Sequence, residues 1–206
     1  MADTTEVVIV GGGAAGCSVA YYLALAGVKS TIIEREGVAS QASGFSAGGL
    51  NPLQGTGIPG PLSEVAMESY LLHQDLFPTL NETTGVDYEW RIISLIKAAF
   101  EQEDLPELQE TFDTFTAAEG FGAEMVDPAQ LQDLEPRISS AVAKAVVARG
   151  NVSLDSYKYT LALVQAAEKM GTSLRSGTVQ GIERSNGRVT GVRIDGGVLH
   201  CDTLVM

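Results

Sequence analysis

Residues 7–16 read VVIVGGGAAG, and this stretch decides the fold. The four apolar residues predict a buried strand, the glycines predict a tight turn, and the residues that follow predict a helix. A second apolar run then ends at Glu34. A strand, a glycine-rich turn, a helix and a second strand that ends in a carboxylate are the elements of a nucleotide-binding α/β unit with parallel strands.

Three glycines of this stretch fit the pattern G-x-G-x-x-G. In that pattern Gly11 allows the tight turn, Gly13 lets the backbone approach a pyrophosphate, and Gly16 lets the helix pack closely on the strand. The phosphates would lie at the helix N-terminus, beside Ala14 and Ala15, where backbone N–H groups and the positive end of the helix dipole favour an anion. A glycine turn without a nucleotide is the alternative, but it does not explain why strand, helix and acid all follow in order.

Glu34 predicts which adenosine dinucleotide would bind. It follows Gly11 at close to the ~20 positions expected of the acid that accepts hydrogen bonds from a ribose hydroxyl. Its carboxylate would repel a 2′-phosphate, so the sequence favours FAD or NAD over NADP. Gly12 occupies a variable position of the pattern, so we expect Gly12→Ala to be milder than a valine at Gly13.

The segment after the second strand distinguishes the two dinucleotides. Residues 40–50 read SQASGFSAGGL, a run of small residues that cannot build a helix face. Together with Tyr21-Tyr22-Leu23-Ala24 and Glu34-Arg35-Glu36, this loop resembles the FAD-dependent amine and amino-acid oxidoreductases typified by glycine oxidase, D-amino acid oxidase and sarcosine oxidase. The alternative is a flexible glycine-serine linker.

The resemblance implies a Rossmann-like FAD/NAD(P)-binding domain of the glutathione-reductase/D-amino acid oxidase type, with an inserted α+β substrate domain. It implies FAD as the cofactor, with the small-residue loop under the flavin. The loop contains neither histidine nor cysteine, the residues that carry the bond in covalent branches, so we expect noncovalent FAD. Besides the glycine turn and Glu34, the cofactor-binding residues implied are Arg35, Ala42, Ser43, Ala47, Gly48, Gly49 and Val179.

Val179 belongs to the last part of the chain, which the resemblance returns to the nucleotide domain. There Asp155 is expected to cap a helix over 156–170, and residues 173–182 to form a strand, a turn and the start of another strand. Asn186-Gly187 lies between two apolar runs and predicts a hairpin, because a type I′ turn needs positive φ at both central positions. Taken by itself, Val179 would be an ordinary strand residue; the family places the adenine against its backbone.

The middle of the chain mixes helix and sheet signals without a glycine fingerprint. Helices are expected over 62–80, 103–119 and 128–134, the last capped by Asp127, and strands over 87–100 and 141–148. We therefore divide the chain into a first FAD-binding part at 1–65, a partial substrate domain at 66–148, and a second, incomplete FAD-binding part at 149–206.

Residues 200–206 enter an apolar strand, and the family implies an A-x-G-x-W-like turn directly after it. We therefore expect a chain truncated at the C-terminus, with limited stability, that does not oxidise amines by itself. No residue is nominated as catalytic, because the residues that grip a substrate would lie beyond Met206.

Composition favours a cytoplasmic protein without nucleic-acid or anionic membrane partners. The formal net charge is −13, and both partners require basic patches. The apolar runs fall short of the ~20 residues that span a bilayer, and no signal peptide precedes the first strand.

The isolated cysteines and histidines predict no metal site. Cys17 and Cys201 are expected to be small buried hydrophobes, and His73 and His200 lack companions with metal-ligand spacing. Trp90 and the neighbouring Asp87-Tyr88-Glu89 could face a substrate, although core packing is the favoured interpretation.

The expected function is oxidation of an amine or amino acid of the glycine, sarcosine or D-amino acid type, by hydride transfer to flavin. The partners would be that small molecule and dioxygen or another electron acceptor; the oligomeric state is left open. The alternatives are a 2-hydroxy acid or glycerol-phosphate dehydrogenase, a related branch that modifies transfer RNA bases, and an inactive nucleotide-binding fragment.

Overall fold

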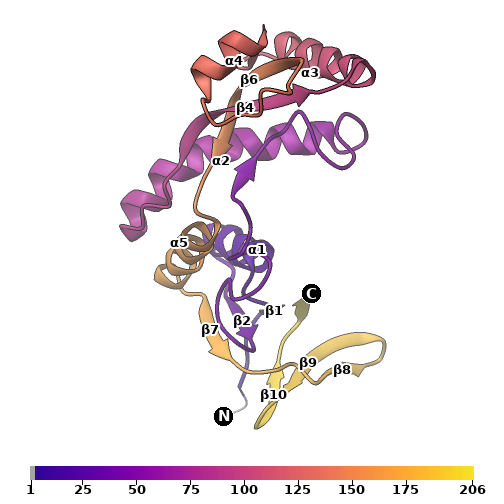
Figure 1. Cartoon of the computed structure of the whole chain (residues 1–206). Coiled ribbons are helices and arrows are strands. Elements are labelled where there is room, and N and C mark those ends of the chain that lie inside the picture. Colours follow the sequence, from indigo (N-terminus) through magenta and orange to yellow (C-terminus); the bar gives the residue numbers. More distant parts are fainter. Residues whose placement is uncertain (1–2) are drawn as a thin grey trace. The chain divides into compact units, whose positions relative to one another are not determined.

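The computed structural model describes residues 3–206 and divides them into two compact units. One unit contains the chain up to Gly48 together with residues 75–89 and 154–206, and the other contains residues 49–74 and 90–153. Each unit is therefore assembled from segments that are distant in the sequence (Figure 1).

A parallel four-stranded sheet forms the centre of the first unit. Its strand order is β11-β1-β2-β7. The strands are β1 (Val7–Val10), β2 (Ser30–Glu34), β7 (Ser173–Ser176) and β11 (Thr203–Val205). The residues of β1 and β2 are almost all buried, so neither strand alternates between apolar and polar residues: β1 is apolar throughout, and the first two residues of β2, Ser30 and Thr31, are polar but buried.

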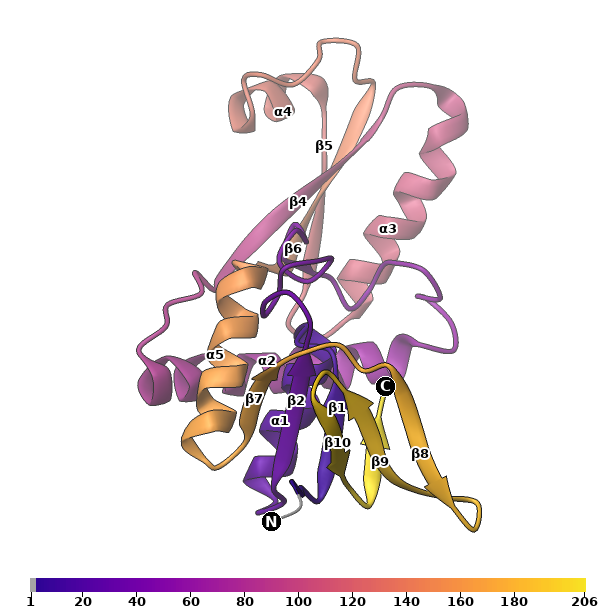
Figure 2. The ribbon, with the colours of Figure 1, turned by 90° about the horizontal axis from the view of Figure 1, so that it is seen from below.

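Two helices, α1 (Ala14–Leu25) and α5 (Ser156–Lys169), pack against each other beside this sheet (Figure 2). α5 begins as predicted, because the Asp155 carboxylate accepts a hydrogen bond of 2.9 Å from the Lys158 amide. It ends just before Gly171, which has a φ of +107°. Cys17 is fully buried within α1, and burial raises the pKa of its thiol to about 12, so it packs as a small hydrophobe.

An antiparallel sheet of three strands completes the first unit. It consists of β8 (Gly181–Ser185), β9 (Arg188–Ile194) and β10 (Gly197–His200), in the order β10-β9-β8. The predicted hairpin is confirmed, because Asn186 and Gly187 both have positive φ, 51° and 78°. Side chains from both sheets share one core, formed by Val8, Ile33, Val192, Ile194, Leu199 and Cys201.

The second unit is built around the long strand β6 (Lys144–Ser153). β6 pairs in antiparallel fashion with β3 (Gly49–Leu50), β4 (Arg91–Ala99) and β5 (Gly122–Val126). A 3-10 turn over Gln102–Asp104 leads into α3 (Leu105–Ala117), whose Leu108 and Phe115 pack on β6. The short helix α4 (Pro128–Leu134) has the predicted Asp127 cap, with a bond of 2.9 Å from the Gln130 amide.

The long helix α2 (Ser63–Thr84) confirms the helix expected over 62–80 and continues through Pro78 to Thr84. The strand expected over 87–100 is partly wrong, because it begins only at Arg91. Tyr88 instead lies fully buried in the first unit, with its ring 5.0 Å from Phe77 and 5.4 Å from Tyr159, as the core-packing interpretation requires.

The compact units and the predicted domains have different boundaries. The sequence divided the chain after residues 65 and 148, whereas the units change after Gly48, Gln74, Glu89 and Ser153. The assignment of residues 66–148 to a substrate domain stays a prediction.

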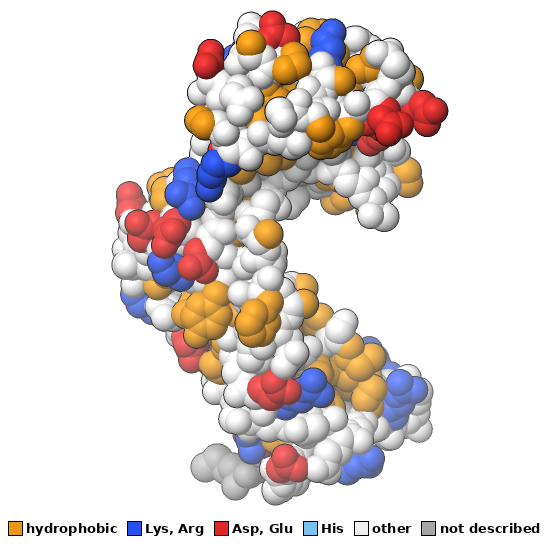
Figure 3. Space-filling model, in the orientation of Figure 1, with side chains coloured by type: hydrophobic (Ala, Val, Ile, Leu, Met, Phe, Trp, Pro, Cys, Tyr) orange, Lys and Arg blue, Asp and Glu red, His pale blue; other side chains and the backbone are white. Residues whose placement is uncertain are grey.

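In the part of the chain that the structure describes, no helix is both long enough and apolar enough to cross a bilayer. On the face drawn in Figure 3, Lys and Arg side chains are scattered in small groups, several of them beside Asp and Glu side chains.

Candidate functional site: a dinucleotide cradle at the ends of β1 and β2

The glycine turn has the backbone geometry that its sequence pattern demands. Gly11 has a φ of +104°, in the region that favours glycine. A Cβ at Gly16 would lie 2.1 Å from the Gly11 carbonyl oxygen, so only glycine lets α1 approach the turn this closely. Both residues are therefore required by the local backbone, independently of any ligand.

The N-terminus of α1 presents backbone donors beside this turn. Gly13 is the N-cap residue and supplies no side-chain cap. The Ala14 amide donates to the Ser43 hydroxyl at 2.9 Å, which connects the small-residue loop to the helix. Across residues 3–206, the amides of Gly13, Ala15 and Gly16 find no hydrogen-bond acceptor. Free N–H groups at a helix N-terminus suit a phosphate.

Glu34 lies at the end of β2 with its carboxylate turned toward the glycine turn. One oxygen accepts a hydrogen bond of 2.7 Å from the Gly12 amide, and the other accepts one of 2.9 Å from the Glu36 amide. Partial burial raises the pKa of the carboxyl, but backbone amides, those of Glu36 and Gly12 foremost, outweigh it and hold the pKa below its ordinary value. The group is thus a fixed acceptor that stays ionised at neutral pH.

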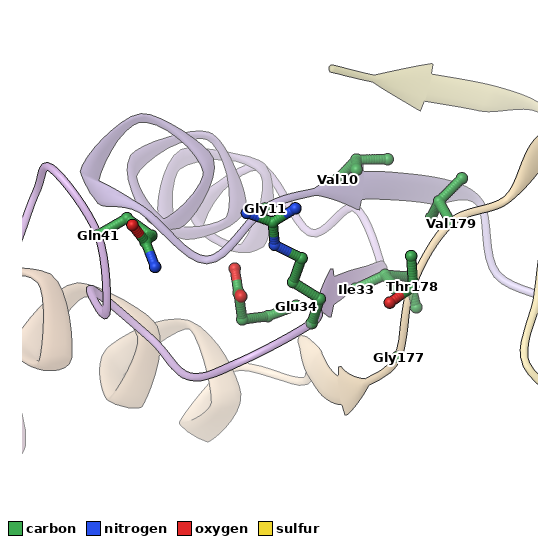
Figure 4. Close-up of a pocket in the computed structure, with 9 residues that line it drawn as sticks. Val10, Gly11, Ile33, Glu34, Gln41, Gly177, Thr178 and Val179 are labelled. Carbon is green, nitrogen blue, oxygen red and sulfur yellow. The ribbon is translucent and has the colours of Figure 1, made fainter.

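A cavity of about 340 Å³ opens at the carboxyl ends of β1 and β2 (Figure 4). Glu34 and Gln41 lie toward one end of it, and Val10 and Val179 toward the other. The cavity is lined by Val10, Gly11, Ile33, Glu34, Arg35, Gln41, Gly177, Thr178 and Val179. An acceptor at one end and aliphatic side chains at the other suit a ribose and an adenine, respectively.

The structure brings together many of the predicted cofactor-binding residues. Gly11, Glu34, Arg35 and Val179 line the cavity, and the helix N-terminus meets Ser43. These residues come from the glycine turn, the end of β2, the small-residue loop and the segment after β7. Their roles toward a ligand stay a prediction.

The remaining loop residues have varied surroundings. Ala42 and Ala47 are exposed, whereas Gly48 is buried with a φ of +71°. Gly48 bonds through its carbonyl to the Leu154 amide at 3.0 Å, so it connects the loop to the residue before the α5 cap. Gly49 begins β3 and belongs to the second unit.

Sequence reasoning missed three further residues of the cavity wall. Gln41, Gly177 and Thr178 line the cavity, although none was expected to. Gly177 and Thr178 precede Val179 directly, so the family loop could have indicated them. Gln41 gave no signal; its amide donates to the Glu36 carboxylate at 2.6 Å.

Comparison with known proteins decides the family. Residues 6–206 match the model of the FAD dependent oxidoreductases. The chain belongs to this family. The predicted relationship, the α/β fold and FAD as the cofactor are thereby confirmed.

Three relatives show the range within this family. The chain is 27% identical to 4-methylaminobutanoate oxidase (formaldehyde-forming) of Paenarthrobacter nicotinovorans, over 98% of this chain and 24% of the relative. It is 30% identical to one subunit of the anaerobic glycerol-3-phosphate dehydrogenase of Escherichia coli K12, over 93% and 34%. The crystal structure of glycine oxidase from Bacillus cereus superposes with a TM-score of 0.86 and 28% identity, over 97% and 55%.

These coverages have a direct consequence for function. The chain spans about half of the glycine oxidase chain and about a quarter to a third of the other two. The match to the family model shows the family, but with these coverages the substrate of the whole protein is a matter for proposal. The free amides at the N-terminus of α1 and the fixed Glu34 acceptor fit a dinucleotide of this kind.

Proposed function

We propose that this chain holds FAD noncovalently at the carboxyl ends of β1 and β2, as part of an enzyme that oxidises an amine or an amino acid. The observation that carries the proposal is the cavity in which Gly11, Glu34 and Val179 meet from three separate segments. Glu34 would accept from the adenosine ribose, the free amides of α1 would bind the pyrophosphate, and Ser43 would position the loop beside it.

The chemistry follows from the cofactor class. The chemistry that FAD would supply here, when bound, is that of an electron acceptor for a hydride from the carbon that bears the amine. The residues of this chain bind and orient the cofactor, and we assign none of them as a general acid or base. The partners would be a small amine or amino acid and dioxygen or another electron acceptor.

A dehydrogenase of glycerol phosphate or of a 2-hydroxy acid is the second candidate. It is favoured by the 30% identity to part of a glycerol-3-phosphate dehydrogenase. The test uses the protein at its full natural length, with glycine, sarcosine and D-alanine in a peroxide assay and glycerol 3-phosphate in a quinone-dye assay. Peroxide formed with an amine supports the first proposal; dye reduction with glycerol 3-phosphate alone favours the second.

FAD binding is tested directly on the purified chain. We expect added FAD to bind and its flavin to be released completely by acid or heat denaturation, because no covalent bond holds it. Flavin that stays with the precipitated protein would contradict noncovalent binding. Binding of NAD but not of FAD, measured by titration calorimetry, would overturn the cofactor assignment.

Replacing Glu34 with alanine should weaken FAD binding by about 1.5–3 kcal/mol, the range for a hydrogen bond to a charged group. The lowered pKa of this carboxyl sets the pH dependence. Its contribution is present above the ordinary glutamate pKa and disappears only as the pH falls through the lowered value. Affinity should therefore be flat near neutrality and decline only at a pH below the ordinary glutamate pKa. Equal affinity of Glu34→Ala and wild type in a FAD titration would contradict the ribose role.

A further inference from the structure

Both backbone polar groups of Gly12 form hydrogen bonds with other segments of the first unit. Its N–H donates to the Glu34 carboxylate at 2.7 Å, and its C=O accepts from the Ala39 amide at 2.9 Å. Ala39, directly before the small-residue loop, is itself buried with a φ of +56°. Gly12 therefore joins the glycine turn, the end of β2 and the loop.

Gly12 also lies in close contact with the side chain that it binds. A Cβ at this position would lie 3.2 Å from Glu34 Cγ and 3.3 Å from both Cβ and Oε2 of the same residue. These separations are tighter than ordinary carbon contacts, so Glu34 would have to move by a few tenths of an ångström. The Glu36 amide holds the other carboxylate oxygen at 2.9 Å and opposes that movement.

We propose that Gly12 is a positioning residue, which fixes the Glu34 carboxylate where it accepts from an unphosphorylated ribose and so sets the preference against a 2′-phosphate. The inference rests on the proposed dinucleotide site and deepens it. It agrees with the expectation that Gly12→Ala is milder than a valine at Gly13, but it gives the alanine an effect of its own, through Glu34. The amide that binds and the missing Cβ that makes room belong to one residue, so the role cannot be met by a larger side chain.

The first experiment needs no nucleotide. The pKa of the Glu34 carboxyl is measured by NMR titration in the wild-type chain and in Gly12→Ala. In the variant, the hydrogen bond from the residue-12 amide to Glu34 would be longer, and the added methyl group would displace water from the carboxylate. Both changes disfavour the ionised form of Glu34, so we expect its pKa to rise. Alanine fits the Gly12 backbone, whose φ is outside the positive region. An unchanged pKa in a folded variant would overturn the positioning role.

The second experiment is a double-mutant cycle with ADP-ribose and 2′-phospho-ADP-ribose as probes. Gly12→Ala should lower the affinity for ADP-ribose about five-fold, which is less than the loss of a whole hydrogen bond to a charged group would cause. It should also reduce the discrimination against the 2′-phosphate probe. In a Glu34→Ala background the same change should cost nothing further, because its effect passes through that carboxylate. Equal losses in both backgrounds would overturn the proposal.

Gly122→Ala serves as the matched control. This glycine lies in β5, where an added Cβ meets nothing within 4 Å, and the variant should bind ADP-ribose as wild type does. A wild-type chain that binds ADP-ribose but not FAD would contradict the proposed cofactor and leave the role of Gly12 supported by the cycle. A chain that binds no probe would contradict the dinucleotide site, and with it the ribose preference assigned to Gly12.

Discussion

FAD binding should fall by more than about 100-fold, equivalent to roughly 2.7 kcal/mol, when Gly13 is replaced with valine. A Cβ at Gly13 would lie 3.0 Å from the Ser43 hydroxyl oxygen, and valine adds two methyl groups beyond it. These atoms would cover the free amides at the N-terminus of α1, where the pyrophosphate is expected. The backbone tolerates the change, because Gly13 has extended torsions, with φ of −81° and ψ of 177°.

The measurement is a FAD titration, with circular dichroism to establish that the variant is folded. Gly122→Val is the control, because it places the same side chain in a strand with open space around the Cβ. A folded Gly13→Val chain with wild-type affinity would place the pyrophosphate elsewhere. If Gly12→Ala lost as much affinity as Gly13→Val, the register of the fingerprint would be wrong.

The parts of the fold that sequence predicted are those set by local chemistry. The strand, turn and helix over residues 7–25 follow from periodicity and glycine, and the caps at Asp127 and Asp155 from side chains that bond amides three residues ahead. The hairpin at Asn186-Gly187 needs only two residues that tolerate positive φ. Each of these features depends on one short consecutive segment, so a single sequence is enough.

Features that depend on distant partners were missed or misplaced. The short strands β3 and β5 form because β6, much later in the chain, pairs Val152 with Leu50 and Ala145 with Val126. Tyr88 was expected in an alternating strand, yet it lies in the first unit, packed on other aromatic rings. Nothing in the pattern over 87–100 indicates where one compact unit gives way to the other.

In the candidate site, too, the features set by local sequence were predicted and those set by distant contacts were not. Gly11, Gly16 and Glu34 belong to one local motif and were found from spacing alone. The Gly12 contact was not, because it requires the Glu34 side chain to bond the Gly12 N–H while the Ala39 amide bonds the Gly12 carbonyl. The polar contact of Gln41 with Glu36 likewise depends on the course of a loop that has no periodicity. Spacing therefore indicates the residues of a motif more easily than the contacts that hold those residues in place.

Gly48→Ala should lower the free energy of unfolding by about 2–5 kcal/mol, the sum of left-handed backbone strain and overpacking. Gly48 has a φ of +71°, and an added Cβ would lie 1.8 Å from the Leu154 carbonyl oxygen. That oxygen belongs to backbone, which cannot rotate aside as a flexible side chain would. The bond of 3.0 Å from the Leu154 amide to the Gly48 carbonyl would be disrupted by any shift that relieved the clash.

The neighbouring glycine provides the matched comparison for this loss of stability. Gly49 has no positive φ, and a Cβ there would meet nothing within 4 Å, so Gly49→Ala should change the free energy of unfolding by less than about 0.5 kcal/mol. Urea denaturation of both variants measures the difference. If Gly48→Ala unfolded at the same urea concentration as Gly49→Ala, the loop could not run against Leu154 as the structure has it.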